Sequence, residues 1–265
     1  MALYDVVGKI TGVPAFCLLG GKMRGSIPLT GGIGLDETDK MVEEACRKVE
    51  EGFRELKIKI GYDPDKDLQT IRKIRNAIPD HVSLRVDANM AWKDVKMAKQ
   101  WIDEAWEYGV HIVEQPLAAD RLDDLAWLRN QVKARILLDE SVWNAADAKK
   151  CLDTKAGDIL HVYTNEAGGL TESRTIFELA SLYHVPCTIG SMPEARIGAS
   201  ASLHLAVAMA NLSEFASDIR GFMLYREDVV HEELRLENGR LYVDEKPGLG
   251  VTVDFEKLNK LTVSV

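Results

Sequence analysis

Three acidic residues, Asp87, Glu114 and Asp139, each follow directly on a short apolar or β-branched segment. Neighbouring parallel strands lie about 4.8 Å apart, so carboxylates at equal height on three consecutive strands would come within a few ångströms of one another. Such a cluster repels itself unless a divalent cation neutralises it, and an all-oxygen ligand set favours Mg²⁺ or Mn²⁺. The spacing therefore predicts a metal site on these three residues, although any one of them could equally cap a helix.

Two lysines, Lys57 and Lys59, stand one residue apart in another such segment. On a strand both side chains would face the same side. Two neighbouring ammonium groups disfavour protonation, which brings one lysine into the pKa range of a working base. Lys59, nearer the strand end, is the predicted base, and Lys57 is a second catalytic candidate. The alternative is a solvated pair on an edge strand, but a closed barrel has no edge strand.

Short apolar or β-branched segments recur along the chain, each followed by a stretch with helical periodicity. They begin roughly 25 residues apart, a spacing that fits a strand, a crossover helix and two short loops. The expected strands are 27–30, 56–60, 84–86, 111–113, 136–138, 159–163, 187–189 and 215–219. Eight such units predict an α/β fold, a TIM-type (β/α) barrel with catalytic groups at the carboxyl ends of its strands. A doubly wound open sheet would need a glycine-rich phosphate loop, and Gly32-Ile33-Gly34 lacks the third glycine.

Length and composition fit one large soluble domain: 265 residues, 46% hydrophobic and 28% charged. A formal net charge of −9 argues against a nucleic-acid-binding surface, which needs basic groups to neutralise phosphates. The four cysteines form no CxxC pair, so neither a disulfide framework nor a zinc site is indicated. No membrane span and no signal peptide are readable, so a cytoplasmic protein is expected.

Several short motifs together resemble those of the muconate-lactonizing-enzyme subgroup of the enolase superfamily. They are Lys57-x-Lys59, Asp87-x-Asn89, Glu114-Gln115-Pro116, Asp139-Glu140-Ser141 and Gly168-Gly169-Leu170. The resemblance implies that Asp87, Glu114 and Asp139 bind Mg²⁺ and that Lys59 exchanges the proton α to a substrate carboxylate. The metal would then stabilise the enediolate. The implied partner is a small-molecule carboxylate, and a homo-oligomer is expected.

The resemblance also implies substrate contacts. Asn89 is expected to bind substrate, and the segment Ser191-Met192-Pro193-Glu194 resembles the family's substrate-facing segment. Glu194 would contact a polar or ammonium group there, with a helix-start acid as the alternative. Asp218 and Arg220, near the expected eighth strand, stay unassigned.

One position departs from the subgroup. Tyr163 stands five residues before Gly168, where the subgroup usually has a second catalytic lysine. Racemases of the subgroup use opposed lysines, so a single base favours a dehydratase, in which Lys59 takes the α-proton and Tyr163 or Lys59 assists loss of a hydroxyl. The substrate would be a hydroxy acid or hydroxylated amino acid. A racemase, epimerase or cycloisomerase is the alternative, and Tyr163 could instead be a core aromatic.

The two ends fall outside the barrel pattern. Residues 1–25 resemble the last helix and linker of the family's capping domain, 26–230 the barrel, and 231–265 a segment returning toward the cap. Residues 241–253 alternate like a hairpin across Pro247-Gly248-Leu249-Gly250. The chain is thus expected to lack most of the cap, whose loops close over the metal. A non-catalytic metal-binding barrel is a third hypothesis, because water reaches the enediolate without a lid.

Overall fold

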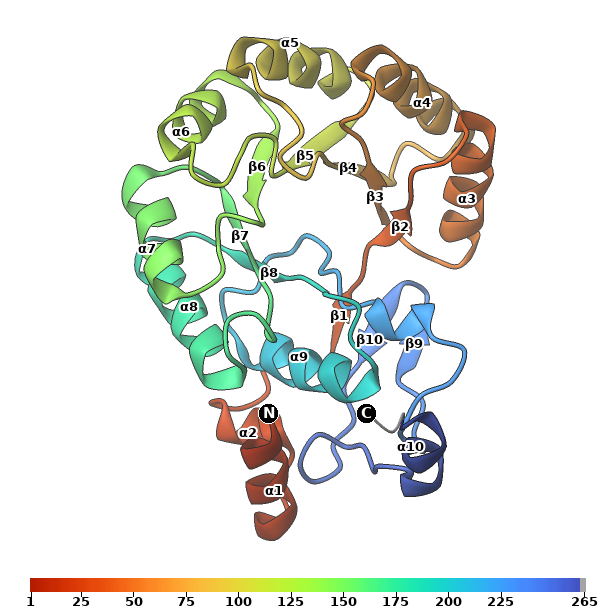
Figure 1. Cartoon of the computed structure of the whole chain (residues 1–265), viewed down its shortest axis with the longest axis vertical. Helices are drawn as coiled ribbons and strands as arrows, with labels where there is room; N and C mark the ends of the chain where they lie inside the picture. Colours follow the sequence, from red (N-terminus) through yellow and green to blue (C-terminus); the bar gives the residue numbers. More distant parts are fainter. Residues whose placement is uncertain (263–265) are drawn as a thin grey trace.

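A curved parallel sheet surrounded by helices forms the body of the molecule (Figure 1). The computed structural model describes residues 1–262. The strands follow one another in chain order: β2 (Gly31–Ile33), β3 (Glu55–Lys59), β4 (Ser83–Asp87), β5 (Val110–Glu114), β6 (Arg135–Leu138), β7 (Ile159–Val162) and β8 (Cys187–Ile189). The helices that alternate with them are α3 (Thr38–Glu50), α4 (Pro64–Ala77), α5 (Val95–Trp106), α6 (Leu122–Gln131), α7 (Ala145–Thr154), α8 (Leu170–Leu182) and α9 (Arg196–Ala208). The predicted α/β barrel is confirmed.

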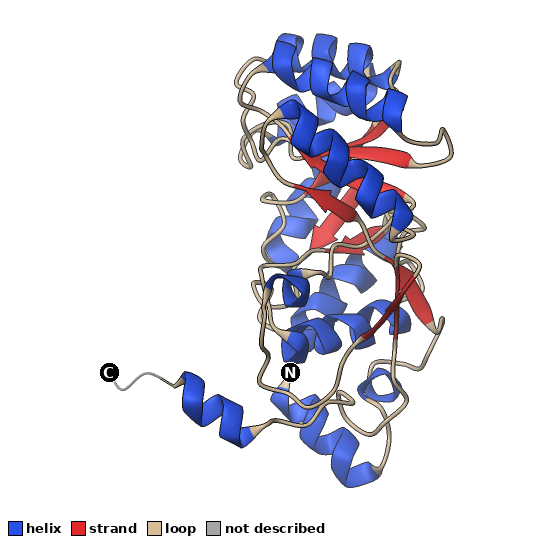
Figure 2. Ribbon diagram, turned by 90° about the vertical axis from the view of Figure 1, so that its right-hand side faces the viewer, coloured by secondary structure: helices blue, strands red, loops and turns tan. Residues whose placement is uncertain are grey.

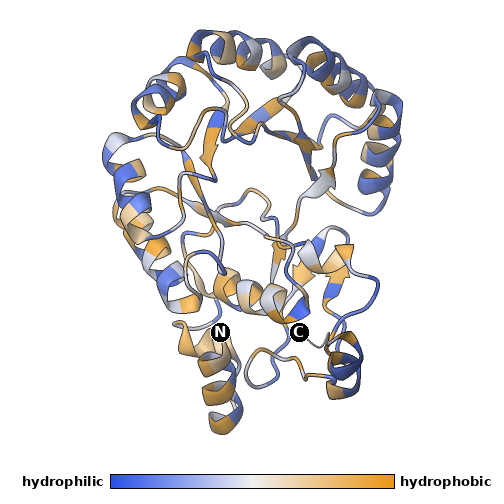
Figure 3. Cartoon of the chain, viewed as in Figure 1, coloured by the Kyte–Doolittle hydropathy of each residue, from blue (hydrophilic) through white to orange (hydrophobic). Residues whose placement is uncertain are grey.

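Three of the barrel helices begin at residues whose side chains hold the first turn. The side chains of Asp63, Asp94 and Asn144 each accept hydrogen bonds from two backbone N–H groups at the starts of α4, α5 and α7. Each helix buries an apolar face, such as Ile71 and Ile74 of α4, against the sheet. Figure 3 shows the apolar residues gathered on the strands and the inner faces of the helices, so burial of this layer fixes the barrel wall.

The eighth barrel position is irregular. Residues 215–219 were predicted to be a strand, and in the described chain they form a single isolated backbone bridge, between Ser217 and Leu29. Ser217 N–H donates to Pro28 at 3.0 Å, Thr30 N–H donates to Ser217 at 3.0 Å, and Asp218 N–H donates to Ile189 at 2.7 Å. The segment therefore joins β8 to the beginning of the barrel without becoming a regular strand.

The first expected strand and the expected C-terminal hairpin were placed wrongly. Residues 26–28 form β1 (Ser26–Pro28), which pairs antiparallel with β10 (Arg240–Tyr242), and the barrel begins instead at β2. The hairpin joins β9 (Arg235–Glu237) to β10 across Asn238-Gly239, where both residues have positive φ, as a tight turn of this kind requires. The stretch around Gly248 instead bonds to Val13 and Ala15. This small sheet joins residues of both predicted segments, 26–230 and 231–265.

Helices at both termini lie outside the barrel ring. They are α1 (Ala2–Thr11), α2 (Ala15–Leu18) and α10 (Phe255–Leu261), and Figure 2 shows α10 projecting from the end of the molecule where both termini lie. A 3-10 helix, η1 (Gly221–Leu224), follows the eighth position. Residues 263–265 of the predicted C-terminal segment lie outside the described part. Within residues 1–262, no helix combines the length and apolarity needed to cross a membrane.

Candidate active site and metal centre

Alternate side chains of the barrel strands point inward and form layers along the barrel axis. Ile112, Leu137 and Ile159 make an apolar layer, with Phe215 packed against it. The residues two positions further along these strands are Glu114, Asp139 and His161, so polarity rises toward the carboxyl ends of the strands. The interior is therefore closed by apolar groups at one end and carries charged groups at the other.

The three predicted acids come together in the upper layers. Asp87, Glu114 and Asp139 are buried, and one carboxylate oxygen of each lies within 4.8 Å of the others. They are not at equal height: Asp87 pairs with Glu114, but Glu114 pairs with Leu137, which places Asp139 further along the axis. Within residues 1–262, Asp139 Oδ1 is buried without a hydrogen-bond partner. Clustered hard oxygen donors, one of them unused, fit a divalent cation.

Gln115 fixes the backbone around the third acid. Its side-chain oxygen accepts hydrogen bonds from the N–H groups of Asp139 at 2.9 Å and Ser141 at 3.3 Å, and its Nε2 donates to Ser141 Oγ. Gln115 has a positive φ of 35°, a conformation that such side-chain bonds help to hold. One glutamine thus joins the ends of β5 and β6.

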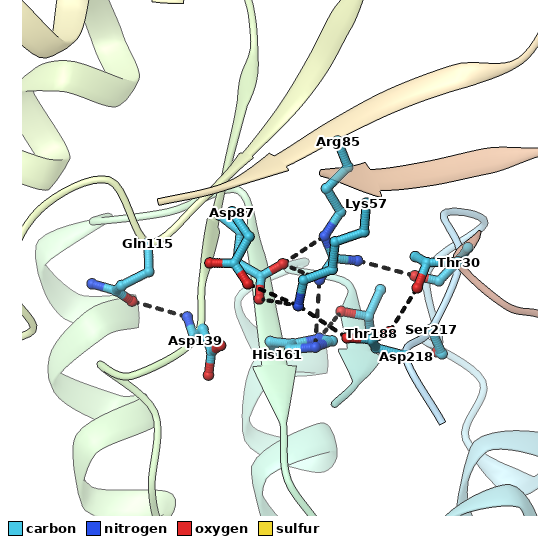
Figure 4. A network of polar contacts seen from close by, with 12 residues as sticks. Thr30, Lys57, Arg85, Asp87, Gln115, Asp139, His161, Thr188, Ser217 and Asp218 are labelled. Carbon is cyan, nitrogen blue, oxygen red and sulfur yellow. Dashed lines mark hydrogen bonds and ion pairs between the residues drawn. The ribbon is translucent and has the colours of Figure 1, made fainter. Parts of the chain in front are cut away.

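Lys57 lies among the carboxylates (Figure 4), and it also lines the cavity. Its Nζ is 2.7 Å from Glu114 Oε1 and 2.9 Å from both Asp87 Oδ2 and Asp218 Oδ2. Burial by itself would lower the pKa of Lys57, but the carboxylates of Asp218, Glu114 and Asp87 outweigh it and raise the pKa. Lys57 therefore stays protonated and neutralises its neighbours.

Lys59 occupies the open end of the same strand. Its Nζ donates to Asp87 Oδ2 at 2.6 Å and to Asn89 Oδ1 at 2.5 Å, while Asn89 Nδ2 donates to Glu140 at 2.9 Å. The Lys59 side chain is 35% exposed, and both Lys59 and Asn89 line a cavity of about 330 Å³. The predicted base and the predicted substrate contact thus stand together at the cavity wall.

Arg85, which the motifs did not single out, supports the acids from below. Its Nε is 2.7 Å and its Nη2 2.5 Å from Glu114 Oε2, and Nη1 donates to the Ala216 carbonyl at 3.2 Å. Burial alone would raise the pKa of Glu114, but Arg85 and Lys57 outweigh it and hold the pKa at about 2. An arginine at inward parity, two residues before Asp87, was the signal that could have revealed it.

Tyr163 lies at the end of β7 and is bound to the metal-site acids. Its hydroxyl donates to Asp139 Oδ2 at 2.8 Å, and a Cβ at Gly190 would lie 2.5 Å from its ring. Burial, together with the negative charges of Asp139 and Glu114, raises the pKa of Tyr163 far above its usual value. In this arrangement the tyrosine hydroxyl is a hydrogen-bond donor. His161 beneath it contacts Thr188 and Arg85, as a structural histidine would.

Asp218 and Glu194 differ in their relation to the cavity. Asp218 accepts from Thr30 Oγ1 at 2.6 Å and contacts Lys57 and Arg220, and it lines the cavity with Arg220. Burial would raise the pKa of Asp218, but Lys57, Arg220 and Arg85 outweigh this effect and hold the pKa well below its usual value.

Glu194, predicted to contact substrate, accepts from Ser191 Oγ at 2.8 Å and is not among the cavity-lining residues. Burial raises its pKa to about 7.

Comparison with known proteins agrees with this geometry. The family model "Enolase C-terminal domain-like" matches residues 40–258. The chain belongs to this family. It is a barrel of the enolase superfamily, muconate-lactonizing-enzyme subgroup, as the motifs predicted.

The superfamily relatives are isomerases and lyases. This enolase-superfamily chain is 32% identical to an L-Ala-D/L-Glu epimerase of Clostridium acetobutylicum, over 95% of this chain and 70% of the relative. It is 36% identical to an o-succinylbenzoate synthase of Geobacillus kaustophilus, over 98% and 68%. A dipeptide epimerase from Cytophaga hutchinsonii, solved with Mg and the dipeptide D-Ala-L-Val, superimposes with a TM-score of 0.92 at 29% identity, covering 98% of this chain and 70% of the other.

Proposed function

We propose that this enolase-superfamily chain removes the proton α to the carboxylate of a small molecule, with Lys59 as general base. The observation that carries the proposal is the position of Lys59: its Nζ touches Asp87, a member of the acidic cluster, and lines the cavity. A substrate carboxylate drawn to that cluster by a cation would present its α-carbon beside the same amine.

Asp87, Glu114 and Asp139 are the residues that would hold Mg²⁺, or Mn²⁺. When bound, the ion supplies a positive charge that stabilises negative charge on the substrate carboxylate as the α-proton leaves. The unused Asp139 Oδ1 and the relative solved with Mg support this assignment. Lys57 contributes a second, permanent positive charge beneath the cluster because its pKa is raised.

The finer proposal is β-elimination, that is, a dehydratase acting on a hydroxy acid or hydroxylated amino acid. Lys59 takes the α-proton, the C–O bond to the β-hydroxyl breaks as the carbon–carbon double bond forms, and the protonated Lys59 returns that proton to the departing hydroxyl as water. The amine is regenerated, so one base suffices. This fits a site in which Tyr163 occupies the end of β7 and holds its proton.

The second candidate is an epimerase, which the names of several relatives favour. It requires reprotonation on the face opposite Lys59, where Tyr163 would be the donor and its bond to Asp139 would have to break. The third candidate is a barrel that binds metal without turnover. The dehydratase, the epimerase and the metal-binding barrel differ in what happens at the substrate α-carbon: loss of its proton with water, inversion of its configuration, or no change.

The test is NMR detection of α-proton exchange in D₂O with Mg²⁺, across a library of carboxylates. We expect exchange, with water loss from β-hydroxylated members, and a fall of about 10²–10⁴-fold in Lys59→Ala. Lys96→Ala, an exposed lysine on α5, is the matched control. Inverted configuration without water loss would select the epimerase.

Tyr163→Phe separates the two roles of the tyrosine. A one-base elimination retains exchange in this variant, whereas an epimerase that uses the hydroxyl as donor loses inversion. Absence of exchange with every carboxylate would contradict both catalytic candidates and leave the metal-binding barrel.

A further inference from the structure

Arg220 is held at the cavity by one edge of its guanidinium group. Its Nε donates to Asp218 Oδ1, and the same oxygen accepts from Thr30 Oγ1 at 2.6 Å. Among the hydrogen bonds of residues 1–262, none gives Nη1 or Nη2 of Arg220 a protein acceptor. Its side chain is 29% exposed. A positioned cation with unused donors therefore lines the substrate space.

Gly32 makes room for this arginine. A Cβ at Gly32 would overlap Nη1, Nη2 and Cζ of Arg220, so the guanidinium lies directly against the backbone of β2. Gly32 pairs with Lys57 in the parallel register, which places it on the inward face of the barrel wall. The arginine is thus confined between Asp218 and a position that only glycine leaves open.

The charges around Arg220 leave it able to bind an anion. Asp218 already faces Lys57 at 2.9 Å, so its negative charge is shared between two cations. Met192, Pro193 and Leu224 are apolar residues that line the same cavity, whose lining also includes Asp139, Glu140 and Ser191. Arginine also presents paired donors that match a carboxylate.

We propose that Arg220 binds a second carboxylate of the substrate and so selects dicarboxylic acids. The inference rests on the proposed function, which places the first carboxylate at Asp87, Glu114 and Asp139. A cavity of about 330 Å³ lies at the small end of ligand pockets, so it suits a short dicarboxylate. Arg220 is then the residue that determines specificity, while Lys59 performs proton transfer.

The test compares succinate, glutarate, adipate and pimelate with the monoamide of each, by calorimetric binding to the Mg²⁺-loaded protein. At least one dicarboxylate should bind about tenfold or more tightly than its monoamide, as expected for a hydrogen bond to a charged group. Arg220→Gln should bring this ratio close to one. Arg220→Lys should keep part of the preference.

Two further variants separate this role from general effects. Arg226→Gln, an exposed arginine outside the cavity lining, should retain the full preference. Gly32→Ala should lose it, because the added methyl displaces the guanidinium. Circular dichroism checks that each variant is folded.

The outcomes distinguish the two proposals. Equal binding of every dicarboxylate and its monoamide, or a preference unchanged in Arg220→Gln, would overturn the role of Arg220. The α-proton exchange of the same compounds is measured in parallel. Exchange without a dicarboxylate preference would support the proposed function and contradict the role of Arg220. A preference lost in Arg220→Gln without any exchange in the wild type supports Arg220 and counts against the catalytic function.

Discussion

Replacing Arg85 by methionine should be among the most damaging single changes to the barrel. The side chain is fully buried, and its guanidinium contacts Glu114 at 2.5–2.7 Å and lies 3.7 Å from Glu55. Arg85→Met keeps an apolar stem but removes the cation beside Glu55 and leaves Glu114 paired with Lys57 alone. Breaking a buried pair from one side typically costs about 3–5 kcal/mol.

The loss is measurable as a change in thermal and urea stability. For a domain of this size, about 3–5 kcal/mol corresponds to a fall in Tm of roughly 10 °C. Arg72→Met on α4 is the control, because that arginine is exposed, and it should change the free energy of unfolding by less than about 0.5 kcal/mol.

A second substitution identifies the cause. If the cost comes from the lost pairing of Glu114 with Arg85, then Glu114→Gln in the Arg85→Met background should recover part of the lost stability, whereas Glu114→Gln alone should destabilise. A change in Arg85→Met as small as in the control, or strictly additive effects of the two substitutions, would refute the reasoning.

Two other predictions concern protons and metal. Burial raises the pKa of Glu194 from 4.5 to about 7. Between these pH values the folded protein keeps a proton on Glu194 that the unfolded chain releases. The contribution of Glu194 to stability is therefore complete below pH 4.5 and is lost as the pH rises to 7. Glu194→Gln should therefore gain stability relative to wild type between pH 4.5 and pH 8, by at most about 3 kcal/mol in chemical denaturation, and an equal difference at both pH values would contradict this. Mg²⁺ at a hundredfold excess over its Kd should stabilise the wild type by about 2.7 kcal/mol in thermal melts. Asp139→Asn should lose most of that gain and the exposed Asp120→Asn should keep it; the same Mg²⁺ response in all three proteins would exclude the proposed ligand.

The sequence predicted the barrel and the acidic cluster because both follow from local rules. An acid that directly ends an apolar strand must lie at the carboxyl rim, so Asp87, Glu114 and Asp139 could be grouped without knowing any contact. The same rule placed Lys59 at the carboxyl end of its strand. The height of Asp139 along the barrel axis was not predicted correctly, because the register between β5 and β6 depends on side-chain packing across the two strands.

Other features depend on contacts between distant segments. Lys57 was expected to be a second catalytic residue beside the base Lys59, because its contact with Asp218, 161 positions away in the chain, could not be read from the sequence. The hairpin turn was predicted at Pro247–Gly250, because the alternation of apolar and polar residues did not distinguish that turn from the true one at Asn238-Gly239. Arg85 and Arg220 were visible as residues, but their roles depend on partners distant in the chain.

The irregular eighth position also bears on the order in which this protein folds. The bridge between Leu29 and Ser217 joins the two ends of the barrel segment, so it closes the longest loop in the wall and carries the largest entropic cost of closure. We expect it to form late. Asp218, the residue next to Ser217, binds both Lys57 and Arg220, so neither lysine nor arginine reaches its final environment before closure. An incompletely folded chain would therefore hold Lys57 and Arg220 without the carboxylate of Asp218, and the charge balance of the site would be complete only once the barrel is whole.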